Sequence, residues 1–247
     1  MNKGLLIIFL VCLMGSCSYD KYRYNFFEGN WVLINYLDTV EKYRSLSTPN
    51  NTGMIEIMLK RHHDSVTFLY NNVESQTFAF TNKTANQIKI DNYINNKPLS
   101  IYINEQAYYL SYKIDSVQYV FIKPDDRLVD STMQNFPPIS TQRVINSLTL
   151  GGIYKQAGNN VPVQFYTNGN ISGLNQFNYY ETCVGGDCMS FYDGDVVIIS
   201  GKNGLQYCTW KWQGKVLTIY ALKLVSLPNE KPNYMKAEKL FALTKIK

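Results

Sequence analysis

The chain has 247 residues, which is long enough for one large domain or two small ones. Its 24 lysine and arginine residues exceed its 19 aspartate and glutamate residues by only five, and this small, scattered excess argues against nucleic-acid binding. The 20 tyrosines and 12 phenylalanines, with frequent asparagine between apolar runs, indicate short strands joined by polar turns.

Residues 1–16 have the three parts of a secretory signal: a positive charge, a short apolar run and a pair of small residues. The apolar run is much shorter than the ~20 residues that a membrane-spanning helix needs. The segment Met14-Gly15-Ser16-Cys17 resembles the lipobox of bacterial lipoproteins. This resemblance implies that residues 1–16 are cleaved, that Cys17 carries a lipid anchor, and that residues 17–25 form a short tether. The alternative is an ordinary secretory signal followed by a chance cysteine.

Strand-like segments dominate the rest of the chain. Many alternate with a period of two, so that Val117, Tyr119 and Phe121 share one face. Only residues 140–148, which begin with a serine cap, have a helical pattern. Short strands separated by turns predict an all-β fold of antiparallel sandwiches or barrels. The expected strands are 54–59, 66–70, 87–90, 99–103, 108–114, 117–122, 161–166, 196–200, 207–212, 216–222 and 239–245.

The chain shows signs of a tandem duplication. Residues 124–150 interrupt the strands and contain Phe136-Pro137-Pro138, which cannot continue the interior of a sheet. The sheet opens with Gly29-Asn30-Trp31 before this break and with Gly152-Ile153-Tyr154 after it. The opening aromatic residue and a closing lysine lie 92 positions apart in the first half and 91 in the second. Either two generic strands are similar by chance, or the chain has two domains. We predict domains at 26–123 and 151–247, joined by a linker at 124–150.

A strand-opening Gly-x-Trp and a basic residue on the last strand of such a unit are similar to the lipocalin pattern. The resemblance implies two tandem lipocalin-like β-barrels, in each of which the first and last strands are neighbours. It also implies a structural cation–π contact that closes one end of each barrel. The pairs would be Trp31 with Lys123 and, less closely because tyrosine replaces tryptophan, Tyr154 with Lys245.

The lipobox and the two barrel patterns together resemble outer-membrane lipoproteins of the Bacteroidota. This implies anchoring in the outer membrane, on either its periplasmic or its surface face. In the same phylum, Asp130-Ser131-Thr132 resembles an O-glycosylation sequon, which implies modification at Ser131 or Thr132. The alternative is that an Asp-Ser pair simply leads from a turn into a strand.

The cysteines beyond the signal indicate a disulfide. Cys183 and Cys188 flank a Gly-Gly turn, and in an oxidising compartment such a hairpin favours a bond between them. Cys208 either pairs with one of them or stays buried as a small apolar residue. We expect no metal site, because His62 and His63 lie far from the thiols in the sequence.

We find no catalytic constellation and expect no cofactor. His62-His63-Asp64 lies between two expected strands, where it is typical of an exposed hairpin tip. Adjacent strand residues point to opposite faces, which argues against both histidines serving one site. The sequence also lacks a Gly-x-Ser-x-Gly elbow, a phosphate loop and a dinucleotide fingerprint.

The expected function is therefore binding by a membrane-anchored, non-enzymatic protein. An eight-stranded barrel either holds one small ligand or fills its interior with side chains. The ligand would be a small apolar molecule, or the barrels would bind a protein or glycan partner in the envelope. Trp210 and Trp212 share one strand face, either as core packing or as an aromatic platform for a sugar or an apolar ligand. The alternative function is a hydrolase acting on glycans or envelope components.

Overall fold

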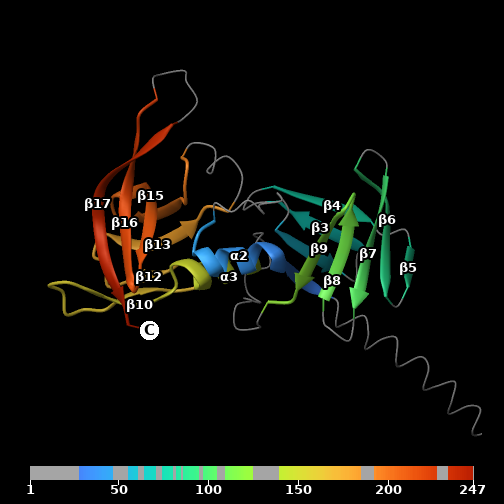
Figure 1. Cartoon of the computed structure of the whole chain (residues 1–247), viewed down its shortest axis with the longest axis horizontal. Helices are drawn as coiled ribbons and strands as arrows, with labels where there is room; N and C mark the ends of the chain where they lie inside the picture. Colours follow the sequence, from blue (N-terminus) through green and yellow to red (C-terminus); the bar gives the residue numbers. More distant parts are fainter. Residues whose placement is uncertain are drawn as a thin grey trace, which may run out of the picture. The chain divides into compact units, whose positions relative to one another are not determined.

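The computed structural model describes residues 28–46, 55–60, 64–70, 74–79, 82–84, 86–94, 97–104, 109–124, 139–184, 192–226 and 233–246. These residues form two antiparallel, nearly closed barrel-like sheets and two helices, so the predicted all-β architecture of two tandem barrels is confirmed (Figure 1). No helix in the described part of the chain is both long enough and apolar enough to cross a membrane.

The first sheet has nine strands in the order β4-β3-β2-β1-β9-β8-β7-β6-β5. The first and last strands of this half, β1 and β9, are neighbours, as the lipocalin resemblance implies. In β7 every second residue (Leu99, Ile101 and Ile103) is buried, which is the expected two-residue period. The strands are β1 (Gly29–Leu33), β2 (Glu56–Lys60), β3 (Ser65–Leu69), β4 (Ser75–Ala79), β5 (Asn82–Thr84), β6 (Gln87–Ile94), β7 (Lys97–Asn104), β8 (Tyr109–Ile114) and β9 (Val117–Ile122).

The second sheet has eight strands in the order β12-β11-β10-β17-β16-β15-β14-β13. Its first and last strands, β10 and β17, again pair directly. The two edge strands approach each other where the amide of Tyr180 donates to the carbonyl of Gly169 at 2.7 Å. The strands are β10 (Gly152–Gln156), β11 (Val163–Phe165), β12 (Ile171–Ser172), β13 (Phe177–Thr182), β14 (Val197–Gly201), β15 (Gly204–Gln213), β16 (Val216–Leu224) and β17 (Tyr234–Lys245).

The helices are α2 (Ile34–Tyr43) and α3 (Ile139–Thr149), which contact each other. Helix α3 matches the helix predicted at 140–148. Its first turn is capped by Glu56, a fully buried carboxylate whose Oε2 accepts a hydrogen bond from the amide of Thr141 at 2.9 Å. Helix α2 was not expected. It buries Tyr36, Leu37 and Val40 and begins without a side-chain cap, so the usual start signal is missing from the sequence.

The chain divides into two compact units. Of the described residues, the first comprises those within 28–31, 57–68 and 76–123, and the second those within 32–56, 69–75 and 124–246. The second unit therefore contains α2, α3 and the second sheet, together with one or two terminal residues of each of β1, β2, β3 and β4.

Candidate ligand-binding site

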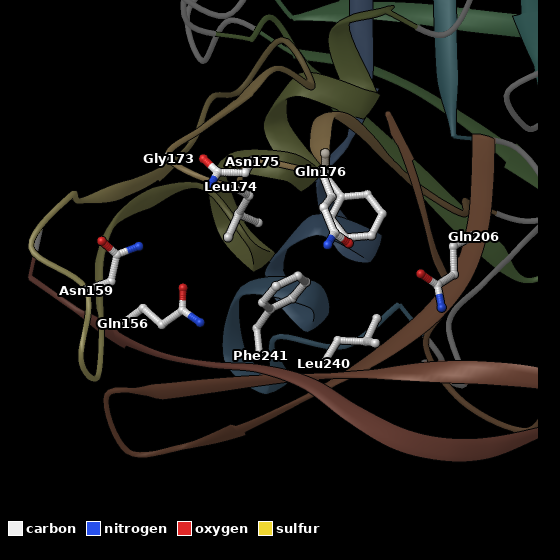
Figure 2. A pocket seen from close by; sticks show the side chains of 10 residues that line it. Gln156, Asn159, Gly173, Leu174, Asn175, Gln176, Gln206, Leu240 and Phe241 are labelled. Atoms are coloured by element: carbon white, nitrogen blue, oxygen red, sulfur yellow. The ribbon is translucent and has the colours of Figure 1, made fainter. Parts of the chain in front are cut away.

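A pocket of about 350 Å³ lies at the end of the second barrel where β10 ends and β15 begins (Figure 2). The side chains around it come from four parts of the sheet: the end of β10, the segment that enters β13, the start of β15, and β17. Its lining consists of carboxamides and apolar groups. The lining residues are Gln156, Asn159, Gly173, Leu174, Asn175, Gln176, Phe177, Gln206, Leu240 and Phe241.

A β-bulge shapes the apolar floor of the pocket. Phe241 lies opposite Ile219 on β16, whereas the next paired residue, Lys239, lies opposite Tyr220. Leu240 is therefore the extra residue of a bulge. Neighbouring residues of a regular strand point to opposite faces. The bulge suspends this alternation, so that Leu240 and Phe241 both line the same pocket.

The rim is held in place by close backbone packing at two glycines. A Cβ atom at Gly173 would lie 2.2 Å from the carbonyl oxygen of Pro162, and one at Gly201 would lie 1.9 Å from that of Gln176. Only glycine permits such an approach. The amide of Lys202 also donates to the Gln176 carbonyl at 3.2 Å. The segment 173–177 is thus fixed against its neighbours before any ligand binds.

Two phenylalanines form the aromatic part of the wall. The rings of Phe177 and Phe241 meet edge to face, with centroids 5.8 Å apart and an interplanar angle of 89°. Both side chains are partly buried, so each leaves some surface open. This geometry is a favourable aromatic pairing, and it keeps the two rings at fixed angles to a ligand.

The polar part of the lining is uncharged. Among the described residues, five carboxamides surround the space, and no lysine, arginine, histidine, aspartate or glutamate lines it. The side-chain amides of Gln156, Gln176 and Gln206 make no hydrogen bond to another described residue. Figure 2 shows these carboxamides grouped around Phe241. Each carboxamide offers both donors and an acceptor, so the pocket can donate hydrogen bonds to carbonyl groups and can either donate to or accept from hydroxyl groups.

The two tryptophans proposed as a ligand platform lie towards the other end of β15 and do not line this pocket. Trp210 is buried, and its indole N–H donates to the carbonyl of Arg44 at 3.1 Å. Trp212 donates to the carbonyl of Thr149 at 3.2 Å. Both indoles are therefore held by hydrogen bonds to backbone carbonyls outside this pocket.

Among the described residues, the cation–π contact predicted for the first barrel is present, whereas the one predicted for the second is replaced by a different contact. The Lys123 ammonium lies 5.4 Å from the ring centroid of Trp31, as the lipocalin pattern implies. Tyr154 and Lys245 are register partners on β10 and β17, yet the Lys245 ammonium lies over Trp212, 5.9 Å from its ring centroid. Here the ring below the lysine comes from β15 and not, as expected, from the opening aromatic residue.

Tyr154 has another role at this end of the barrel. Its hydroxyl donates to the carbonyl of Leu150 at 2.5 Å, and its ring lies edge to face against Phe165. Burial raises the pKa of the Tyr154 hydroxyl above its ordinary value, and the nearby Arg44 lowers it in part. Tyr154 therefore joins the barrel core to the end of α3.

The cysteines agree in part with the prediction. Cys183 is disulfide-bonded. Cys188, its predicted partner, lies outside the described residues, as do Cys17, His62, His63, Ser131 and Thr132. Cys208 is buried and has a free thiol, so it is not the partner of Cys183. Within the described ranges, no three histidine, cysteine, aspartate or glutamate side chains are grouped closely enough to hold a metal ion.

Sequence reasoning did not find the pocket. Its members come from positions as distant as Gln156 and Phe241, and glutamine on a short strand carries no recognisable motif. The one local signal is Gly173-Leu174-Asn175-Gln176-Phe177, a turn-forming run that supplies half of the lining. No family model, curated protein or solved structure matches the chain.

Proposed function

We propose that the protein is a non-enzymatic binding protein whose second barrel takes a small, neutral, hydroxyl-rich ligand such as one or two sugar rings. The observation that carries the proposal is the set of uncharged carboxamides around two phenylalanine rings in one pocket. A volume of about 350 Å³ is at the lower end of small-molecule sites, which span about 300–1,000 Å³.

The lining favours a neutral polar ligand over a wholly apolar one. An apolar molecule would cover the carboxamides and remove them from water without replacing their hydrogen bonds. Each such loss costs about 1–3 kcal/mol. A sugar instead offers hydroxyls to the carboxamides and C–H groups to Phe177 and Phe241. A charged ligand would enter a lining that has no opposite charge to compensate for its lost hydration.

The same lining favours binding over hydrolysis. Glycoside hydrolysis commonly needs two carboxyl groups beside the scissile bond. None of the described residues around this pocket carries a carboxyl or imidazole group. An envelope lipoprotein with such a site would hold a glycan near the membrane through the lipid on Cys17. The anchor and its outer-membrane location remain part of the proposal.

Binding can be measured by isothermal titration of the purified protein with neutral and acidic mono- and oligosaccharides, preselected on a glycan array. Gln206→Leu should weaken binding of the neutral ligand about two- to tenfold, which corresponds to one lost hydrogen bond of about 0.5–1.5 kcal/mol. Phe241→Ala should weaken it further, because it removes half of the aromatic wall.

Gln213→Leu is the matched control, since Gln213 lies on the same strand but is exposed at the opposite end and does not line the pocket. It should bind like the unmodified protein. The proposal is refuted if no neutral saccharide binds saturably, or if Gln206→Leu and Gln213→Leu have equal effects.

A further inference from the structure

A second pocket of about 250 Å³ lies at the other end of the second barrel, and its lining is cationic. It is formed by the turn after β15, the end of β17 and the residue that follows α2. Of the five described residues that line it, three are basic and none is acidic. The lining residues are Arg44, Gly214, Lys215, Lys245 and Ile246.

The backbone around Arg44 is tightly held. Arg44 adopts a left-handed conformation (φ 50°) as the C-cap of α2, and its amide donates to the carbonyl of Val40 at 2.7 Å. Its own carbonyl accepts the indole N–H of Trp210. The next two residues are fixed by Asp195, whose Oδ1 accepts from the Ser45 hydroxyl at 2.9 Å and from the Leu46 amide at 2.6 Å. The guanidinium therefore projects from a fixed point.

The two lysines are also placed by backbone contacts. Gly214, with φ at +58°, begins the two-residue turn that carries Lys215, and the Lys215 carbonyl accepts from the Lys245 amide at 2.8 Å. The Lys245 ammonium donates to the carbonyl of Gly151 at 2.8 Å. That bond uses one of its three donors and leaves two for a ligand.

Two of the positive charges at this pocket lie over the same aromatic ring. The Arg44 guanidinium and the Lys245 ammonium both lie over the ring of Trp212, at 4.5 and 5.9 Å from its centroid. Among the described residues, no carboxylate forms an ion pair with Arg44, Lys215 or Lys245. Partial burial and the proximity of Arg44 lower the pKa of Lys245, which is the expected result of crowding two cations.

We propose that this pocket binds a phosphate-type oxyanion, held between the Arg44 guanidinium and the ammonium groups of Lys215 and Lys245. A guanidinium matches two phosphate oxygens at once, and lysine supplies additional point charges. A phosphate group carries up to two negative charges and thereby neutralises most of the local excess. The phosphate comes either from a soluble phosphomonoester or from a lipid headgroup, and the two sources present the same oxyanion to the pocket.

The first test is titration of the purified protein with inorganic phosphate at low ionic strength, monitored by 31P NMR line broadening and by thermal unfolding. Saturable binding with a rise in Tm is expected, because a ligand that binds only the folded state stabilises it. Lys215→Gln should weaken binding at least threefold. This lysine is exposed on a turn and contributes only its backbone to the fold, so the variant is expected to remain folded. Arg44→Gln should weaken binding at least tenfold.

Lys211→Gln is the matched control, because it removes the same charge from an exposed position on β15 outside the pocket. Equal losses in Lys211→Gln and Lys215→Gln would overturn the proposal, as would the absence of saturable phosphate binding or equal affinity for acetate. Glycerol phosphate and vesicles of phosphatidylcholine with or without phosphatidic acid then separate the two sources. Binding of glycerol phosphate or of the phosphatidic acid vesicles that is weakened by Lys215→Gln supports the site. If neither binds, the proposal is overturned.

Discussion

Asn146 offers the sharpest test of how α3 is joined to the second barrel. Its side chain is 1% exposed and makes three hydrogen bonds. The Oδ1 atom accepts from the Gln142 amide and from the Thr182 hydroxyl, both at 3.0 Å, and the Nδ2 group donates to the carbonyl of Thr167 at 2.9 Å. Asn146→Ala removes all three bonds and leaves the Asn146 backbone, which caps the end of α3, in place.

The expected loss of stability is about 3 kcal/mol, since each lost hydrogen bond contributes about 1 kcal/mol. Urea unfolding, followed by circular dichroism, should show a lower midpoint with an unchanged slope. Tm should fall by roughly 6–12 °C, given about 2–4 °C per kcal/mol for a chain of this size. Asn178→Ala is the control: this asparagine is exposed at a β13 bulge, so its removal should change stability by less than about 0.5 kcal/mol.

A double-mutant cycle separates the network from simple loss of volume. Thr182→Val removes the hydroxyl that donates to Asn146, and Thr182 is fully buried. Because both substitutions break the same bond, their combined effect should be smaller than the sum by about 0.5–3 kcal/mol. Strict additivity, or a loss below about 1 kcal/mol for Asn146→Ala, would refute the reasoning.

Three other predictions concern β17, Cys208 and Lys123. Deletion of Leu240 removes this bulge and restores alternation at Phe241, so saccharide titration should show loss of binding while circular dichroism still shows a folded sheet. Burial, with a smaller contribution from Glu238, raises the pKa of the Cys208 thiol to about 12. The unfolded thiol ionises at lower pH, so the unfolded state binds fewer protons between pH ~9 and ~12 and stability falls as pH rises through this window. Urea midpoints of Cys208→Ala should therefore fall less steeply over this range than those of the unmodified protein, and equal slopes would contradict the explanation. Lys123→Ala should cost about 0.5–1 kcal/mol through loss of its contact with Trp31, measured by thermal unfolding, whereas Lys113→Ala, at an exposed position of β8, should cost less.

Local patterns in the sequence were sufficient for most strands and for one helix. Apolar and polar residues alternate along a strand, so β7 and β9 can be recognised without knowledge of the strands that pair with them. Helix α3 was found because a serine stands near its start. Helix α2 was missed because Leu33, at its N-cap position, provides no capping side chain, and because its three buried residues are too few to show a clear period.

The candidate sites depended on the tertiary structure. The pairing of β10 with β17 brings Gln156 opposite Leu243, near Phe241, and one extra residue in β17 turns Leu240 to the same side. Neither the strand pairing nor the bulge can be recognised from a local sequence pattern. Strand pairing joins positions that are distant in the sequence, and a bulge is defined only against its partner strand.

The lipocalin resemblance shows the same division. The sequence was enough to pair Trp31 with Lys123, and it placed Tyr154 and Lys245 on adjoining strands. It did not show that the cation of Lys245 lies over Trp212, or that Arg44 shares this ring. The sequence by itself determined most of the strands, because their formation follows from local alternation. Only the tertiary structure decided which side chains meet at the two ends of the second barrel, because those contacts depend on register, bulges and the packing of α2.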